Sequence, residues 1–253
     1  FKNEEEADYP PDYEPQAIEW GELYRSGYHM GITHLHHFYT KRNFRVMYSM
    51  WEASNAFEPQ IRDAIRLLLL SYNATHSTLM TRVVVKKNSK DFVLTGAQSG
   101  VLYISSLPVE KNIIMGVKRK LKSFENAFAY LNTCSGRFVV NNTSSQNLTQ
   151  ADKSVDYIFT DPPFGDFIPY AEVNQINELW LGATTERTDE IIISPSQKKD
   201  VSRYQKMMTD VFNEMRRVLK DGAFATVVFH ASKAAVWNAL RAAYSNAGFF
   251  VDK

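Results

Sequence analysis

The stretch V-D-Y-I-F-T-D-P-P-F-G, from Val155 to Gly165, decides the fold of this chain. Its first half, Val155 to Phe159, is apolar and rich in β-branched and aromatic residues, which predicts a buried strand of a parallel sheet. Two prolines follow, and proline cannot donate to a ladder, so we expect the strand to stop at Asp161. Ligands of open α/β sheets bind beyond the carboxyl ends of the strands. The stretch therefore predicts a site built from a carboxylate, two prolines and an aromatic ring.

The residues on both sides of this stretch alternate between strand and helix patterns. The predicted segments are a strand at Arg137–Val140, a helix at Val173–Leu181, a polar loop at Thr184–Asp200, a helix capped by Ser202 and closed by Gly222, a strand at Phe224–Phe229, and a helix capped by Ser232 that ends before Gly248. Such alternation from Arg137 onward predicts a parallel α/β sheet.

The preceding part of the chain has a different pattern, dominated by helices. Apolar residues at Phe44, Met47, Tyr48 and Trp51 have the spacing of an amphipathic helix. A second helix is expected to begin at Glu58-Pro59, since proline favours the first helical position. Its predicted apolar face comprises Ile61, Ala64, Ile65, Leu68 and Leu69.

A small β appendage is predicted after these helices. Three short apolar runs, Val83–Val85, Phe92–Leu94 and Val101–Ile104, are separated by turn-forming residues. We interpret Gly96–Gly100 as a hairpin turn, because it lacks the Lys-Ser/Thr of a phosphate-binding loop and does not precede a helix.

Asn112 to Leu131 is predicted to be a further helix, and it holds the densest basic cluster of the chain, Lys118-Arg119-Lys120 and Lys122. The opposite face is apolar, with Val117, Leu121, Phe124 and Phe128. A solvated helix face accounts for these charges. A face lying along a nucleic-acid backbone is the alternative interpretation, and it stays open.

Composition limits the classes of protein that this chain can represent. Its 253 residues are 44% hydrophobic, enough for one domain with a sizeable appendage or for two small domains. The net charge is +1, so a nucleic-acid partner would have to meet local basic patches. Cys134 is the single cysteine, which excludes an internal disulfide and a thiolate cluster. No apolar run reaches the roughly 18 residues of a membrane span, so we expect a cytoplasmic protein without a membrane partner.

His34, His36 and His37 form an H-x-H-H sequence. Its spacing fits no zinc pattern, and no Cys or carboxylate is paired with it, so we predict no metal site. Residues 1–19 are acidic and contain several prolines, which predicts a linker. We expect the chain to be a piece of a longer protein, because it begins at Phe1 without methionine and ends just after the strand-like Phe249–Val251.

Asp161-Pro162-Pro163-Phe164 resembles the [DNS]-P-P-[YF] motif of S-adenosylmethionine-dependent amino methyltransferases. Two further segments support the resemblance. Arg217–Gly222, R-V-L-K-D-G, is similar to the R-V-L-K-P-G turn of many such enzymes, with Asp221 in place of proline. Phe38–Asn43 resembles an F-x-T-P-R-Q segment of some large bacterial DNA methylases, from which Lys41 and Asn43 depart, so that only Thr40 and Arg42 carry over.

The resemblance implies a partial Rossmann-like methyltransferase sheet in residues 132–253, with a helical and β-hairpin insertion in residues 20–131. It implies transfer of a methyl group from S-adenosylmethionine to an exocyclic amine of a DNA base, in a role such as restriction-modification, with adenine N6 favoured over cytosine N4 by the Asp. The base would flip out of the duplex. The implied catalytic residues are Asp161, Pro162 and Phe164; the implied substrate-binding residues are Pro163, Gly165, Tyr170 and Arg42; and the implied cofactor-binding residues are Ser144 and Asp161.

Two departures from the family concern the cofactor. Ser144 stands where the family has an acidic residue that contacts the adenine of the cofactor. The glycine-rich turn that binds the methionine end of the cofactor is absent from residues 1–253, and we expect it before Phe1. Two alternatives stay open: an RNA amino methyltransferase with the same motif, and a noncatalytic nucleic-acid-binding piece. The recognition sequence, the oligomeric state and the existence of a restriction partner are not predicted.

Overall fold

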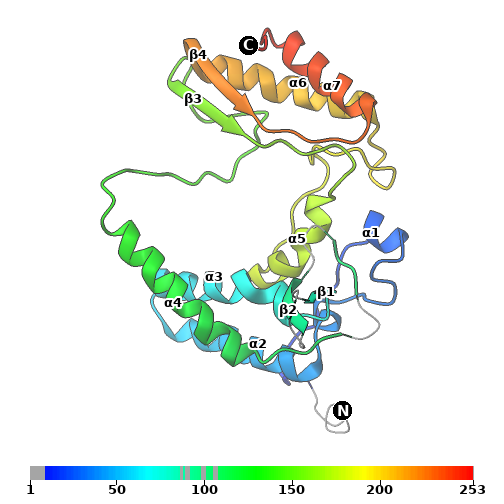
Figure 1. The fold of residues 1–253 in the computed structure, drawn as a ribbon, viewed down its shortest axis with the longest axis vertical. Coiled ribbons are helices and arrows are strands. Elements are labelled where there is room, and N and C mark those ends of the chain that lie inside the picture. Colours follow the sequence, from blue (N-terminus) through cyan, green and yellow to red (C-terminus); the bar gives the residue numbers. More distant parts are fainter. Residues whose placement is uncertain (1–8, 86–87, 89–91, 98–100, 105–107, 253) are drawn as a thin grey trace. The chain divides into compact units, whose positions relative to one another are not determined.

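The computed structural model describes residues 9–85, 88, 92–97, 101–104 and 108–252 (Figure 1). The chain forms two compact units, which are described separately. The first comprises Phe1–Gly136 and Tyr170–Thr185, and the second comprises Arg137–Pro169 and Glu186–Lys253. A boundary near residue 131 was predicted, but the assignment of Tyr170–Thr185 to the first unit was not.

The first unit is mainly helical. Its elements are α1 (Glu22–Arg25), η1 (Leu35–Phe38), α2 (Lys41–Ala53), η2 (Ser54–Ala56), α3 (Pro59–His76), α4 (Ile113–Leu131), α5 (Tyr170–Glu178) and η3 (Leu179–Leu181). The three long helices α2, α3 and α4 are confirmed predictions. Thr40 caps α2, because its hydroxyl accepts a hydrogen bond from the backbone N–H of Asn43 at 3.2 Å. One detail of α3 was wrong: Ile61 of the predicted apolar face is exposed.

The β appendage is confirmed as one antiparallel pair, β1 (Thr81–Val85) with β2 (Phe92–Ala97). Val101–Ile104, predicted as a third strand, makes a single bridge between Ile104 and Leu79. The hairpin turn predicted at Gly96–Gly100 begins within β2, and residues 98–100 lie outside the described part of the chain.

Helix α5 belongs to the first unit because its buried face is bonded there. The buried Glu172 carboxylate accepts hydrogen bonds from the backbone N–H groups of Glu22 at 2.7 Å and Leu23 at 2.8 Å. These are orphan donors at the start of α1, which an anion at that position satisfies. The side chain of Asn73 donates to the Ile176 carbonyl at 2.8 Å, and the Trp180 indole donates to the Tyr39 hydroxyl at 3.0 Å. These hydrogen bonds attach α5 and η3 to this unit together with the apolar packing of Ile176, Leu179 and Trp180 in its core.

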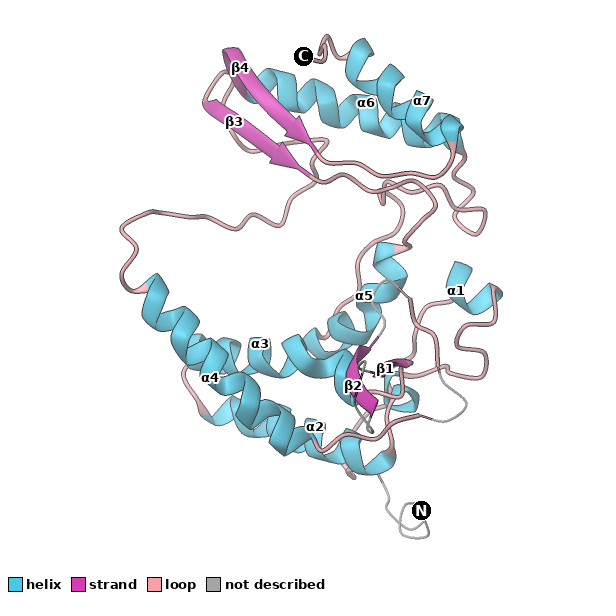
Figure 2. Ribbon diagram, in the orientation of Figure 1, coloured by secondary structure: helices cyan, strands magenta, loops and turns pink. Residues whose placement is uncertain are grey.

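The second unit is a mixed α/β structure (Figure 2). Its strands β3 (Val155–Thr160) and β4 (Leu219–Val227) pair in parallel, as predicted, and end together, with Thr160 opposite Val227. The helices α6 (Val201–Val218) and α7 (Ala234–Asn246) pack against each other and against one face of this pair, through Ile158 and Ala225. The register shifts near Gly222, whose φ of +77° produces a turn inside β4.

The predicted burial of β3 was wrong on one face. Tyr157, Phe159 and Phe224 are 54, 66 and 62% exposed, because α6 and α7 cover the opposite face. The strand predicted at Arg137–Val140 is also absent from the described part of the second unit. Its backbone has no ladder partner there, and its apolar side chains are exposed.

Two helix caps differ from the prediction. Asp200, not Ser202, caps α6: its carboxylate accepts a hydrogen bond from the N–H of Arg203 at 2.8 Å. Lys233, not Ser232, precedes α7, and it makes no side-chain cap. Among the described residues, no helix is both long enough and apolar enough to cross a membrane.

Candidate functional site

The D-P-P-F motif lies where the sequence predicts it, immediately after the carboxyl end of β3. The N–H of Val228 donates to the Thr160 carbonyl at 2.9 Å, so the last residue of β3 is still bonded to the chain leaving β4. Asp161 follows, and its side chain is exposed. No described residue donates a hydrogen bond or forms an ion pair with its carboxylate. The carboxylate oxygens of Asp161 are therefore available to accept hydrogen bonds from a ligand.

Helix α6 holds the centre of the motif. The fully buried Tyr204 donates a hydrogen bond from its hydroxyl to the Pro163 carbonyl at 2.6 Å. Pro162 is buried and Pro163 half-buried. Sequence reasoning missed this contact, because Tyr204 occupies an apolar position of the α6 stripe. The hydroxyl of Tyr204 was the one feature of the sequence that could have indicated the contact, since a buried phenol usually finds a hydrogen-bond partner.

Phe164 is half-buried and rests edge-on against an aromatic pair. Its ring centroid lies 5.5 Å from that of Phe229 with an interplanar angle of 86°, and Phe229 in turn lies 5.0 Å from Trp237. The ring centroid of His230 lies 6.5 Å from that of Phe164. The ring therefore contributes to packing of the second unit and still exposes part of its surface.

Gly165 makes the turn that ends the motif. Its φ is +75°, and an added Cβ would lie 2.9 Å from Cγ1 of Val236 and 3.2 Å from Cδ1 of Ile193. The Gly165 carbonyl accepts a hydrogen bond from the Ile193 N–H at 3.2 Å, and the next residue, Asp166, pairs with Lys233 at the start of α7. Both the backbone angle and the close approach require glycine at this position.

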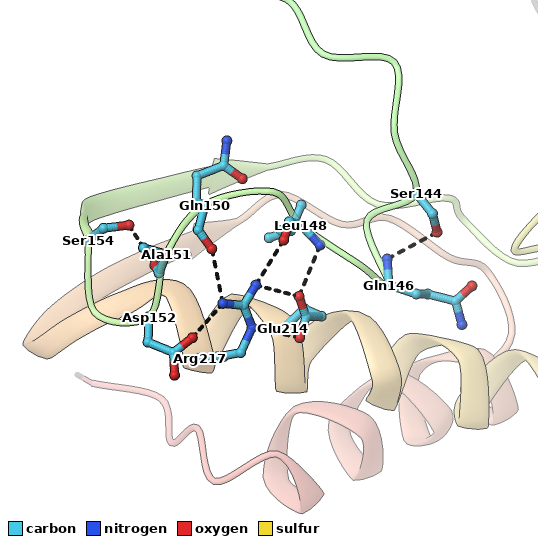
Figure 3. A network of polar contacts seen from close by, with 9 residues as sticks. All are labelled: Ser144, Gln146, Leu148, Gln150, Ala151, Asp152, Ser154, Glu214 and Arg217. Atoms are coloured by element: carbon cyan, nitrogen blue, oxygen red, sulfur yellow. Dashed lines mark hydrogen bonds and ion pairs between the residues drawn. The ribbon is translucent and has the colours of Figure 1, made fainter.

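Ser144, the candidate cofactor residue, lies on an exposed turn before β3 (Figure 3). Its hydroxyl accepts from the Gln146 N–H at 3.2 Å, and its carbonyl accepts from the Asn147 N–H at 3.0 Å. These bonds shape the turn itself. Among the described residues, no carboxylate is bonded to Ser144 that could contact the cofactor adenine in place of the family's acidic residue.

Arg217 fixes the loop between Ser144 and β3 (Figure 3). Its guanidinium donates to the carbonyls of Leu148 at 2.9 Å and Gln150 at 3.0 Å, and it forms ion pairs with Asp152 and Glu214. These hydrogen bonds to Arg217 lower the pKa of Glu214 and keep its carboxylate charged. The Arg of the R-V-L-K-D-G segment is thus a loop anchor in this unit.

Arg42 and Tyr170 belong to the first unit, whereas the D-P-P-F motif, Gly165 and Ser144 belong to the second. Arg42 forms a bidentate ion pair with Glu110, at 2.9 Å and 2.6 Å, and Thr40 donates to the same carboxylate at 2.9 Å. The hydrogen bond from Arg42 lowers the pKa of Glu110. Tyr170 is the first residue of α5 and is partly exposed.

The loop between Glu186 and Asp200 encloses a buried lysine. The ammonium group of Lys199 donates to the carbonyls of Arg187 and Glu190, both at 2.6 Å, and burial lowers the pKa of Lys199. A cavity of about 500 Å³ lies between this loop and the start of α6, and a smaller one of about 360 Å³ is lined by Ile193 and Val201. Neither cavity is lined by Asp161 or Ser144.

His34, His36 and His37 of the first unit form a cluster of edge-on and tilted ring contacts. The ring centroids of His36 and His37 lie 4.3 Å apart, and Nδ1 of His36 is 3.1 Å from the Tyr13 hydroxyl. Burial and the neighbouring histidines lower the pKa of His36 to about 4. Within the described ranges, no group of three or more His, Cys, Asp and Glu side chains has an arrangement that could hold a metal ion.

The second unit thus presents a carboxylate free to accept hydrogen bonds beside two anchored prolines and a partly exposed ring. Such a group of residues can bind an amino group next to a planar ring. No known family model, curated protein or solved structure matches this chain.

Proposed function

We propose that this chain carries the base-binding half of an S-adenosylmethionine-dependent DNA methyltransferase, which methylates an exocyclic base amine, adenine N6 in preference to cytosine N4. The observation that carries the proposal is the exposed Asp161 carboxylate at the carboxyl end of β3, followed by the two prolines and Phe164. The parallel pairing of β3 with β4 is the arrangement in which ligand sites form at that end.

The chemical role of these residues follows from the weak nucleophilicity of an exocyclic amine, whose lone pair is delocalised into the ring. The carboxylate of Asp161 and the carbonyl of Pro162 would each accept one N–H hydrogen. Holding both hydrogens favours a tetrahedral nitrogen with its lone pair released from the ring. A base must leave the duplex to reach these groups, and the exposed part of Phe164 would stack on it.

The described residues fit the cofactor only in part. S-adenosylmethionine would supply an electrophilic methyl group, but the Ser144 hydroxyl already accepts a bond within its own turn, and the chain has no glycine-rich turn. The cavities beside the Glu186–Asp200 loop are not lined by Ser144 or Asp161. We therefore assign the amine-side chemistry to this chain and derive no step through the cofactor.

The test is methyl transfer from labelled S-adenosylmethionine by the intact protein that contains this chain. Unmethylated DNA and RNA are offered separately, and the labelled nucleosides are identified after digestion. The proposal predicts label on N6-methyl-2′-deoxyadenosine from DNA. Label found in RNA alone would favour the RNA methyltransferase alternative, and absence of label from both would favour a noncatalytic nucleic-acid-binding role.

A further inference from the structure

Helix α4 concentrates positive charge. Lys118, Arg119, Lys120 and Lys122 outweigh Glu125, giving +3 within this helix, whereas the whole chain sums to +1. The rest of the chain therefore sums to −2. Lys122 forms a mostly solvated ion pair with Glu125 at 3.1 Å. In the part of the chain that the structure describes, no carboxylate pairs with Lys118 or Arg119.

Lys118, Arg119 and Lys122 lie on the exposed side of α4, its outer face, whereas Lys120 is half-buried. Lys118 and Lys122 are four residues apart, about one helical turn or 6 Å along the axis. Arg119 lies beside them, and both Lys118 and Arg119 are exposed. Tyr130 follows Arg119 by three turns, so it projects within about 20° of the same direction and about 17 Å further along. Tyr130 is 69% exposed. The face therefore combines a row of cations with an accessible aromatic ring.

The inner face of the same half of α4 is packed against the first unit. Ile113 is buried, and Gly116 lies so close to His76 that an added Cβ would be 2.3 Å from its Nε2. An amphipathic membrane helix needs its apolar face free beside its cations. Leu121 and Phe128 of α4 are each 44% exposed, so the choice of a polyanion rests on the charge of +3 in this helix, and binding to anionic vesicles is the competing outcome of the test.

The positive charge acts on neighbouring groups. Burial lowers the pKa of Lys111, and the charge of Arg119 lowers it further. The pKa of His76 is lowered to about 4 by burial, by Lys111 and by Arg119. Cations gathered this closely repel one another, and a bound phosphate relieves that repulsion.

We infer that the outer face of α4 is a nucleic-acid-binding surface, on which Lys118, Arg119 and Lys122 contact successive phosphates of a single strand and Tyr130 stacks on a base. Basic grooves with interspersed aromatic rings bind single strands in this manner. The inference deepens the proposed function, since it rests on the same class of partner, but it requires no methyl transfer.

The test is binding of the 253-residue chain to a fluorescently labelled single-stranded oligonucleotide, measured by anisotropy over a range of salt concentrations. Lys118→Glu with Arg119→Glu should lower the affinity at least about tenfold and reduce the magnitude of the salt slope by about 1.4, because two phosphate contacts are lost. Lys206→Glu with Arg241→Glu is the matched control: it makes the same charge change at exposed positions of α6 and α7 and should change the affinity less than about twofold. A neutral pair, Lys118→Gln with Arg119→Gln, should fall between them.

Stacking is tested separately. Tyr130→Ala should weaken single-strand binding about fivefold or more, and Tyr130→Phe should restore it. If the α4 charge variant and the control variant bind with equal affinity, the inference is overturned. Methyl transfer by the intact protein would still support the proposed function in that case. Loss of binding in the α4 variant without methyl transfer by the intact protein would support the surface and reject the enzyme. An unmodified chain that binds anionic vesicles but no oligonucleotide would also overturn the inference.

Discussion

The hydroxyl of Tyr204 donates a 2.6 Å hydrogen bond to the carbonyl oxygen of Pro163. This bond joins the first turn of α6 to the middle of the D-P-P-F motif. A pair of prolines is already restricted in φ, so one bond to the carbonyl between Pro163 and Phe164 is enough to define the direction in which the chain leaves β3. The positions of Asp161 and Phe164 therefore depend on a helix that begins some 40 residues later in the sequence.

Tyr204→Phe removes this bond without removing the ring. We expect a loss of about 1 kcal/mol in the free energy of unfolding, because the Pro163 carbonyl keeps its desolvation cost and loses its donor. Urea unfolding measures the change. Tyr244→Phe on α7 is the matched control, since the Tyr244 ring packs on Phe212 and its hydroxyl has no hydrogen-bond partner among the described residues. Equal losses in both variants would contradict a specific role for the Tyr204 bond.

Gly165→Ala introduces a Cβ into the turn after the motif. It combines an unfavourable positive φ with a close approach to Val236 and Ile193. Gly222→Ala in the same unit has the positive φ alone, because nothing lies within 4 Å of its added Cβ. We expect Gly165→Ala to lower the free energy of unfolding by at least about 1 kcal/mol more than Gly222→Ala. If denaturant melts show no difference, Gly165 is not sterically required.

Phe164→Ala should reduce base extrusion as well as stability. Stacking on an aromatic ring is worth about 1 to 3 kcal/mol per base, so the extruded population should fall roughly tenfold or more. A fluorescent base analogue at the target position measures extrusion by the intact protein. Phe164→Tyr and Phe164→Trp keep a π face and should retain much of the signal.

Phe229→Ala is the control for Phe164. It removes the ring on which Phe164 rests and should lower the melting temperature without removing the stacking surface. An unchanged extrusion signal in Phe164→Ala, together with a lower melting temperature, would make Phe164 a packing residue only.

His76 should make the first unit sensitive to acid. Burial, Lys111 and Arg119 lower its pKa to about 4, below the value of 6.5 expected in the unfolded chain. The neutral ring therefore contributes stability in full above pH 6.5, and the contribution is lost as the pH falls from 6.5 towards 4. Urea midpoints of the unmodified chain should fall over this range, and His76→Gln should show a smaller fall. Identical pH profiles would show that His76 is not responsible.

The strand and helix pattern of the second unit was largely predictable, because the spacing of apolar residues along one segment indicates whether that segment buries one face as a helix or as a strand. The apolar stripe from Tyr204 to Val218 and the stop of β3 at the prolines are both such local signals. Exposure of Tyr157, Phe159 and Phe224 was not predictable, because an apolar strand has the same composition whether one or both of its faces are covered. Arg137–Val140 shows the same limit, since a strand-like sequence needs a neighbouring strand to form a ladder.

The attachment of α5 to the first unit was missed for a different reason. It combines apolar packing of Ile176, Leu179 and Trp180 with hydrogen bonds to the Glu172 carboxylate from two backbone N–H groups about 150 residues away in the sequence. A periodic pattern does not encode which unit such residues pack against. The position of the motif at the end of β3 was predictable from the prolines, whereas its anchoring by Tyr204 and the loop anchor Arg217 are tertiary contacts.

Methyl transfer by the intact protein carrying Asp161→Ala tests the central claim most directly. Asp156→Ala is the matched control, because Asp156 is an exposed carboxylate of β3, the strand that Asp161 follows, and it pairs with Lys220. We predict that Asp161→Ala lowers label incorporation into DNA at least about a thousandfold. Its affinity for DNA should stay near that of the unmodified protein, because affinity comes mainly from phosphate contacts. The rate of methyl transfer by Asp156→Ala should also stay near that of the unmodified protein. Near-normal turnover by Asp161→Ala would contradict the assignment of Asp161 to the amine.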